Sequence, residues 1–137
     1  MAHWLLKSEP GTYSWDRLVR EKRTAWDGIT NTTALIHLRN FAVGDEAFFY
    51  HSGEERRIVG VARVVKAAYP DPAKNDPKLV AVDIEAVGPV KKPVDLATLK
   101  ATPALEGWDL FRISRLSVVP VSAAHWRVLM KLAGGVG

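Results

Sequence analysis

The segment WDGITN, residues 26 to 31, places a large flat aromatic ring beside carboxylate, hydroxyl and amide groups. A buried tryptophan usually belongs to a periodic apolar run. Trp26 instead lies in a short polar stretch between two helical patterns, which we predict to be a loop. Such a ring can stack on a planar ligand while polar neighbours hydrogen-bond the edge of that ligand. Alternatively, Trp26 plugs one end of the core and Asp27-Gly28 merely forms a turn.

The other reactive side chains do not combine into a familiar catalytic or metal-binding motif. The four histidines are His3, His37, His51 and His125, and no two have metal-ligand spacing such as HxH or HExxH. The absence of cysteine excludes disulfides, thiol catalysis and cysteine-based zinc sites. His51-Ser52 is close to Glu54-Glu55, but no GxSxG elbow supports a hydrolase triad. The sequence therefore predicts a binding module without cofactor or metal rather than an enzyme.

Length and composition indicate one soluble globular domain. The chain has 137 residues, 47% of them hydrophobic and 25% charged. No apolar run approaches the roughly 20 residues that span a bilayer, so no membrane association is expected. The N-terminus has only three apolar residues, Trp4 to Leu6, before Lys7, which does not resemble a signal peptide. These features favour a cytoplasmic location, and we expect a monomer.

The formal net charge of +4 is compatible with a polyanionic partner such as nucleic acid. The basic residues are scattered along the chain in small clusters, each of which could simply be a solvated face. Charge alone therefore permits a nucleic-acid partner without requiring one.

Periodicity predicts an α+β fold with little regular alternation of strand and helix. The predicted strands are His3 to Lys7, Glu46 to His51, Arg57 to Ala67, Leu79 to Val87 and Arg115 to Val121. The predicted helices are Trp15 to Lys22 after an N-cap at Ser14, Thr32 to Arg39, Val94 to Lys100 with Asp95 as its cap, and one capped by Ser122. This order argues against a doubly wound parallel sheet and favours a curved, mostly antiparallel sheet or small barrel with helices around it. Residues 134 to 137 are expected to be a frayed tail.

Four segments together resemble the signature blocks of EVE-domain proteins. They are HWLLKSEP at residues 3 to 10, WDGITN at 26 to 31, FFYHSG at 48 to 53 and SRLSVVPVS at 114 to 122. They follow the order of the family and span nearly the whole chain. The resemblance implies a single domain over residues 1–133 with a PUA-like fold, a strongly bent, mostly antiparallel β-barrel with flanking short helices, related to the YTH and ASCH domains. It also implies a pocket for a nucleobase in DNA or RNA, typically a modified one such as methylated cytosine, taken out of its stack.

The resemblance assigns roles to particular residues of this chain. Trp26 would be the stacking wall, Gly28 a point of close backbone approach, and Asn31 a reader of the base edge. Arg115 could also meet a phosphate. The full set of expected ligand-binding residues is Lys7, Ser8, Trp26, Gly28, Ile29, Thr30, Asn31, Tyr50, His51, Ser52, Arg115, Leu116 and Ser117.

One position departs from the family pattern. Thr30 stands where the family often has arginine, and threonine cannot replace a bidentate, permanently charged donor. The preferred base could therefore differ. Two alternatives to a non-enzymatic reader stay open at this point. One is a nuclease or nucleic-acid-modifying enzyme of the ASCH kind, with His51 or Asp27 as general base, and the other is a sensor of a free nucleobase or nucleoside.

Overall fold

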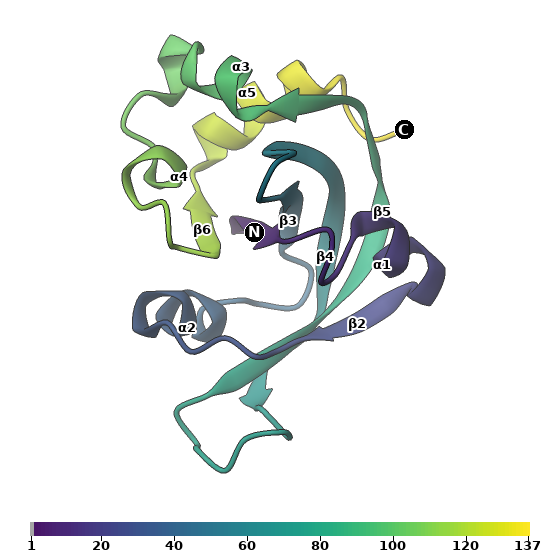
Figure 1. Ribbon diagram of the computed structural model, residues 1–137, viewed down its shortest axis with the longest axis vertical. Coiled ribbons are helices and arrows are strands. Elements are labelled where there is room, and N and C mark those ends of the chain that lie inside the picture. The colour runs from purple at the N-terminus through teal and green to yellow at the C-terminus, as the bar shows by residue number, and fades with distance from the viewer. Residues whose placement is uncertain (1) are drawn as a thin grey trace.

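Six strands form one mixed, strongly bent sheet in the order β2-β5-β4-β3-β1-β6 (Figure 1). The computed structural model describes residues 2–137. The strands are β1 (His3–Ser8), β2 (Arg23–Trp26), β3 (Glu46–His51), β4 (Arg57–Pro70), β5 (Val80–Asp95) and β6 (Val118–Val121). Within this sheet β1 and β3 run parallel and the other neighbouring pairs run antiparallel.

Short helices connect and flank the strands. They are α1 (Trp15–Glu21), α2 (Thr32–Arg39), α3 (Leu96–Lys100), the 3₁₀ helix η1 (Pro103–Leu105), α4 (Asp109–Arg112) and α5 (Ala123–Ala133). The four helix starts that carry a side-chain cap are capped by Ser14, Asn31, Asp95 and Ser122, each accepting a backbone N–H three residues on. In residues 2–137 the longest helix, α5, has 11 residues, and none has the length and apolar character that crossing a bilayer requires.

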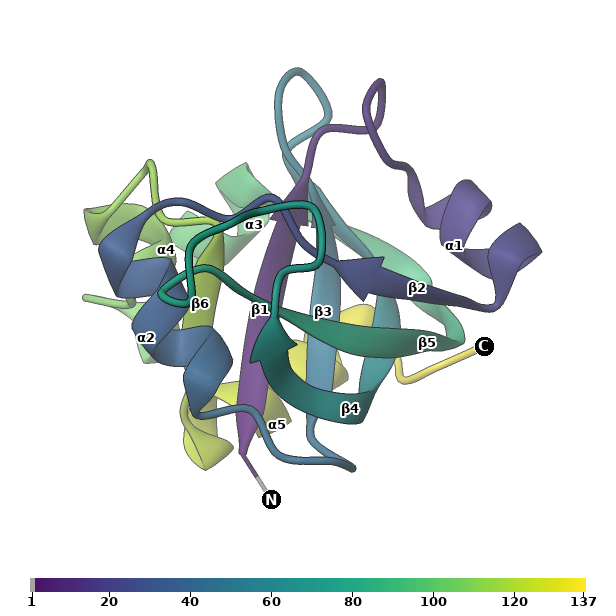
Figure 2. The same cartoon turned by 90° about the horizontal axis from the view of Figure 1, so that it is seen from below.

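The sheet bends far enough to enclose the core, but its two edge strands do not pair with each other. Helix α2 packs against β6 and β5 and so covers the opening between the two ends of the sheet (Figure 2). The core is apolar and continuous, with Phe48, Phe49 and Leu6 fully buried at its centre. The predicted α+β, PUA-like, strongly bent and mostly antiparallel fold is confirmed, with the barrel left open between β2 and β6.

Several predicted element boundaries are wrong. The stretch before Asp27 is not a loop, because Arg23–Trp26 forms β2 and pairs with β5, Trp26 lying opposite Val82. A four-residue segment has too weak a local signal to be recognised, and its partner strand is distant in sequence. Strand β5 continues to Asp95, eight residues past the predicted end at Val87.

The C-terminal tail also differs from the prediction. The tail was expected to fray, but Gly135 accepts the N–H of Lys91 at 3.0 Å and Gly137 donates to the carbonyl of Pro89 at 2.7 Å. Val136 forms an isolated bridge with Val90. These partners lie on β5, so the tail extends the sheet locally. Glycine-rich composition alone gives no sign of this pairing.

Candidate functional site

A cleft of about 430 Å³ lies between β1, the segment that follows it, α1 and β2. Sites for small planar ligands commonly have roughly 300–1,000 Å³, so the volume suits a ligand the size of a nucleoside. We call it the Trp26 cleft. Its lining residues are Lys7, Ser8, Glu9, Thr12, Tyr13, Arg17, Thr24, Ala25, Trp26, Asp27 and Ile29.

Trp26 belongs both to the core and to this cleft. Its side chain is only 8% exposed and packs edge-on against Phe49, with ring centroids 5.6 Å apart and an interplanar angle of 76°. The Trp26 ring also packs edge-on against Tyr13, with ring centroids 5.9 Å apart and an interplanar angle of 89°. The two readings of Trp26 from the sequence, core plug and ligand wall, are therefore not exclusive. Trp26 closes the core with one side and lines the Trp26 cleft with another.

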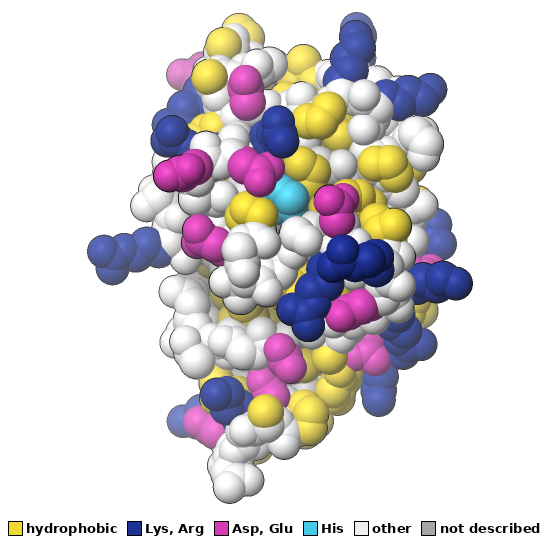
Figure 3. All heavy atoms as spheres, turned by 45° about the vertical axis from the view of Figure 1, so that its right-hand side comes forward, with side chains coloured by type: hydrophobic (Ala, Val, Ile, Leu, Met, Phe, Trp, Pro, Cys, Tyr) yellow, Lys and Arg dark blue, Asp and Glu magenta, His cyan; other side chains and the backbone are white. Residues whose placement is uncertain are grey.

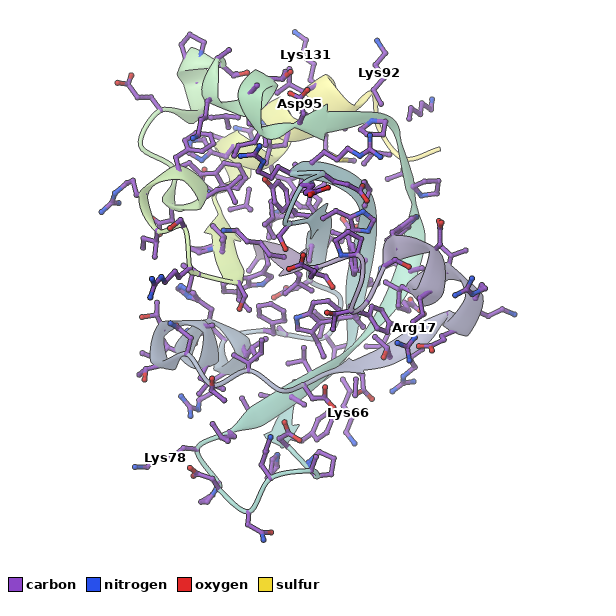
Figure 4. All side chains as sticks on the ribbon, in the orientation of Figure 1. Arg17, Lys66, Lys78, Lys92, Asp95 and Lys131 are labelled. Atoms are coloured by element: carbon purple, nitrogen blue, oxygen red, sulfur yellow. The ribbon has the colours of Figure 1, made fainter. Side chains whose placement is uncertain are left out.

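Tyr13 is the main lining residue that the sequence did not reveal. Its carbonyl accepts the hydroxyl of Ser8 at 2.5 Å, and its own hydroxyl donates to Glu21 at 2.7 Å. The guanidinium of Arg17 lies 4.9 Å from the ring centre, and Figure 4 shows this side chain extending from α1 toward β2. Burial raises the pKa of the Tyr13 phenol above its ordinary value, so the hydroxyl stays protonated at neutral pH. Only its position just after the Pro10-Gly11 turn could have drawn attention to it.

A second cleft of about 300 Å³ lies beside the first, and Lys7 lines both. We call it the Arg56 cleft. Its lining residues are Lys7, Tyr50, Ser52, Gly53, Arg56, Leu96, Lys100, Leu110, Phe111 and Ser114. The end of β1 and the loop after β3 meet here, since Ser52 donates its N–H to the carbonyl of Ser8 at 2.9 Å (Figure 2). Two of the expected ligand-binding residues, Tyr50 and Ser52, thus lie in a different cleft from Trp26.

His51 lines neither cleft, contrary to its expected place beside Tyr50. Side chains alternate between the two faces of a strand, so Tyr50 and Ser52 share one face while His51 points to the other. There His51 is 8% exposed, and its Nε2 accepts the N–H of Trp15 at 3.0 Å. Because Nε2 accepts, Nδ1 carries the proton and donates to Glu55 at 3.0 Å. This hydrogen bond lowers the pKa of the Glu55 carboxyl. The ring therefore anchors the start of α1.

The WDGITN segment is held by a hydrogen bond from the loop between β4 and β5. The N–H of Gly28 donates to the buried carboxylate of Asp71 at 3.1 Å, and Asp71 also accepts the N–H of Ala73 at 3.0 Å. Gly28 has φ +73°, and a Cβ there would meet nothing within 4 Å, so glycine is needed for this turn rather than for close packing. Asn31 uses its side-chain oxygen to cap α2 through the N–H of Ala34 at 2.9 Å. Gly28, Thr30 and Asn31 line neither cleft.

The segment around Arg115 meets the site through its backbone. Lys7 donates its backbone N–H to the carbonyl of Ser117 at 2.9 Å and its Nζ to the carbonyl of Ser114 at 3.0 Å. Leu116 is buried in the core and Arg115 is exposed, and neither side chain lines a cleft. Burial lowers the pKa of the Lys7 ammonium below its ordinary value. The predicted strand from Arg115 is shorter than expected and begins at Val118.

The surface charge around the site is mixed. On the face shown in Figure 3, Lys and Arg side chains are interspersed with Asp and Glu side chains and form no continuous basic patch. This agrees with the scattered basic residues of the sequence.

Replacing Asp71 with alanine should loosen the WDGITN segment. Two backbone N–H groups would lose their acceptor, which should cost about 1–3 kcal/mol in the free energy of unfolding. Asp76 lies in the same loop, and its carboxylate accepts the exposed N–H of Lys78. Asp76→Ala is thus a matched control. Urea unfolding should separate the two variants, and equal midpoints would contradict a structural role for the Asp71–Gly28 contact.

Solved structures with the same fold include close bacterial relatives. An NMR structure from Rhodopseudomonas palustris is 46% identical, with a TM-score of 0.93, covering 98% of this chain and 94% of that one. The YTH domain of Zygosaccharomyces rouxii MRB1 is 17% identical, with a TM-score of 0.59, covering 99% of this chain and 88% of that one. That second likeness concerns the fold alone.

Human thymocyte nuclear protein 1 is a further relative. It is 33% identical over 165 residues, covering 96% of this chain and 73% of the human protein. A crystal structure shows human THYN1 in complex with 5-methylcytosine-containing DNA, with 32% identity, a TM-score of 0.90 and complete coverage of both chains. This relative is named as a nuclear protein, which contradicts the cytoplasmic location expected from the sequence. The absence of cysteine from the sequence could not decide it, because disulfides are rare in both cytosol and nucleus.

The sequence profile of the EVE domain matches residues 2–132. The match spans the four blocks that the sequence suggested, and both clefts lie within it. The chain therefore belongs to the EVE-domain family.

Proposed function

We propose that the Trp26 cleft holds a single nucleobase of a nucleic acid, and that the protein is a non-enzymatic reader of a modified base such as 5-methylcytosine. The observation that carries this proposal is the pair of perpendicular rings, Trp26 and Tyr13, in a cleft of about 430 Å³. A flat base stacked on one ring meets the edge of the other, which is a favourable aromatic geometry. The complex of human THYN1 with 5-methylcytosine-containing DNA supports the choice of ligand.

The polar groups of the cleft suit the edge of a base. Thr12 and Thr24 bring hydroxyls, Asp27 brings a carboxylate that can accept from an exocyclic amine, and Arg17 brings a guanidinium. Lys7 also supplies the positive charge that the family often places at the position of Thr30, whereas Arg17 is paired with Glu21 at 3.1 Å. Thr30 itself is exposed and outside the cleft, so its side chain takes no part in this proposal.

Binding without catalysis is favoured by the state of His51. A general base needs a free nitrogen within reach of a substrate proton. Both ring nitrogens of His51 are engaged, one by the N–H of Trp15 and the other by Glu55, on the face away from the Arg56 cleft. Asp27, the other candidate base, is exposed to solvent. Neither residue therefore offers a basic atom that is both unengaged and sheltered from solvent.

A panel of modified and unmodified oligonucleotides, single- and double-stranded, tests the proposal directly. The expected result is tighter binding of oligonucleotides that carry 5-methylcytosine than of unmodified ones of the same sequence. Equal affinity across the panel would leave only nonspecific electrostatic attraction and would overturn the proposal. Product analysis on the same samples checks catalysis, since any turnover of the oligonucleotide would overturn the non-enzymatic role.

Oligonucleotide affinity should depend on the protonation of Lys7. Because burial lowers the pKa of Lys7, its positive charge is lost at a lower pH than that of an exposed lysine. Binding should therefore weaken as the pH rises from 7 toward 10. In Lys7→Arg the charge persists, so this variant should keep its affinity over that range. Titrations at several pH values compare the two, and parallel pH profiles would contradict a role for the Lys7 charge.

A further inference from the structure

The charges of the Arg56 cleft are all of one sign. Its lining includes three cations, Lys7, Arg56 and Lys100, and no carboxylate. The Trp26 cleft, in contrast, contains Glu9 and Asp27 beside its cations. The Arg56 cleft is therefore suited to an anion rather than to a neutral base.

Two of these cations have no anionic partner among the residues that the structure describes. Among residues 2–137, neither Arg56 nor Lys100 forms an ion pair or a side-chain hydrogen bond. Arg56 and Lys100 also line a neighbouring pocket that contains three carboxylates, Glu54, Glu55 and Asp95, and two of these are occupied. Glu55 accepts from His51 and Arg57, and Asp95 caps α3 through the N–H of Thr98. Arg56 and Lys100 are thus available to an external anion.

The loop that carries Arg56 is held in a defined conformation. Arg56 has φ +46°, an uncommon value for a residue with a side chain, and its carbonyl accepts the N–H of Leu96 at 2.8 Å. This contact joins the loop after β3 to the start of α3, the helix that carries Lys100. The two cations therefore come from segments fixed to each other.

Lys7 connects this cleft to the Trp26 cleft, because it lines both. Its Nζ is held by the carbonyl of Ser114 at the wall of the Arg56 cleft. A strand with one base in the Trp26 cleft would pass over Lys7, and a phosphate next to that base would face the Arg56 cleft. The hydroxyls of Ser52 and Ser114 add neutral donors there.

We propose that the Arg56 cleft binds a backbone phosphodiester of the nucleic-acid strand whose base occupies the Trp26 cleft. This rests on the proposed function and adds a second, sequence-independent site to it. Arg56 and Lys100 are the residues that contact the phosphate, and Lys7 spans both sites. Aromatic Phe111, at the wall of the cleft, packs against the adjoining sugar.

The test compares the double variant Arg56→Ala/Lys100→Ala with wild type on a single-stranded 5-methylcytosine oligonucleotide at several salt concentrations. The double variant should bind about tenfold more weakly at low salt, and the slope of log affinity against log salt should fall by about 1. Its preference for methylated over unmethylated oligonucleotide should not change, because a phosphate carries no base identity.

A matched control removes two cations elsewhere. Lys92 and Lys131 are exposed, line neither cleft and point away from the molecule at its upper end in Figure 4. Lys92→Ala/Lys131→Ala lowers the net charge equally, and its salt slope should stay close to that of wild type. Equal slopes for the two double variants would overturn the phosphate site.

The free nucleoside 5-methyl-2′-deoxycytidine separates failure of this proposal from failure of the base site. It has no phosphate, so wild type and Arg56→Ala/Lys100→Ala should bind it equally in calorimetry. Its two monophosphates should bind wild type more tightly than the nucleoside, and this gain should vanish in the double variant. A gain that persists would overturn the phosphate site alone. Absence of nucleoside and oligonucleotide binding to wild type would overturn both proposals.

Discussion

Trp26→Ala is expected to weaken binding of a 5-methylcytosine oligonucleotide about tenfold to a hundredfold. Stacking of a base on an aromatic side chain contributes roughly 1–3 kcal/mol, and alanine offers no face for it. The structure adds a second effect that the sequence could not give. Because Trp26 is 8% exposed and packs on Phe49, its truncation should also cost about 3–5 kcal/mol in the free energy of unfolding.

Trp126 provides the control that separates these two effects. It is also 8% exposed, and it packs on Phe48 and His3 from α5 rather than lining either cleft. Trp126→Ala should lose a similar amount of stability, measured by chemical denaturation, but keep the affinity of the folded protein for the oligonucleotide. Equal affinity of the folded Trp26→Ala and Trp126→Ala proteins would show that Trp26 is only a core residue.

A milder pair of substitutions, to phenylalanine at the same two positions, keeps the test valid if either alanine variant fails to fold. Trp26→Phe retains an apolar ring against Phe49 but presents a smaller face to the cleft. It should fold and should bind the oligonucleotide more weakly than wild type, whereas Trp126→Phe should bind as wild type does. The ratio of affinities, measured at a temperature where both proteins are folded, is the deciding quantity. Identical affinities for the two phenylalanine variants would contradict the stacking role.

Most helices were predictable because the signals that start a helix, a capping residue and the helical pattern after it, are local in sequence. Ser14, Asp95 and Ser122 are each followed by a helical pattern, and each accepts the backbone N–H expected of a cap. The strand at His3 and the strand at Glu46 were equally clear from their apolar and aromatic composition. What could not be predicted was pairing between distant segments. The sheet order, the parallel pair β1–β3 and the docking of the tail on β5 depend on contacts that no local pattern encodes.

The site shows the same limit at the level of single residues. The family resemblance placed Lys7, Ser8, Trp26 and Ile29 in one expected pocket, and the structure does bring these four to one cleft. The family resemblance could not show that Asn31 and His51 use their polar atoms inside the protein. Asn31 caps α2, and His51 holds the start of α1.

The residues missed by the sequence, Tyr13, Arg56 and Lys100, lie in a loop or at a helix end. Arg56 and Lys100 become neighbours of the site through packing of segments distant in sequence, whereas Tyr13 lies only five residues after Ser8. A tyrosine, an arginine and a lysine on the surface are common, so their types carry no signal. Strand alternation could have separated Tyr50 from His51, because the predicted strand from Glu46 to His51 already puts them on opposite faces.

Gly60 links the bend of the sheet to the Trp26 cleft, and a side chain there should disturb both. It lies on β4 opposite Phe49, where the registers of β3 with β4 and of β4 with β5 both shift. A Cβ on Gly60 would come within 2.5 Å of the ring of Trp15, the first residue of α1. Since Trp15 is buried and donates its N–H to His51, it cannot retreat without moving the helix.

Gly60→Ala should therefore lower the free energy of unfolding by about 1–3 kcal/mol or more, because a well-packed core resists even one added methyl group. Gly11→Ala is the matched control, since a Cβ at that exposed position meets nothing within 4 Å. Denaturant unfolding, followed by tryptophan fluorescence, should separate the two variants. The Gly60 variant should also bind the oligonucleotide more weakly, because α1 carries Arg17 into the cleft. An unfolding midpoint equal to that of Gly11→Ala would mean that Trp15 repacks freely, and that α1 is not fixed by this contact.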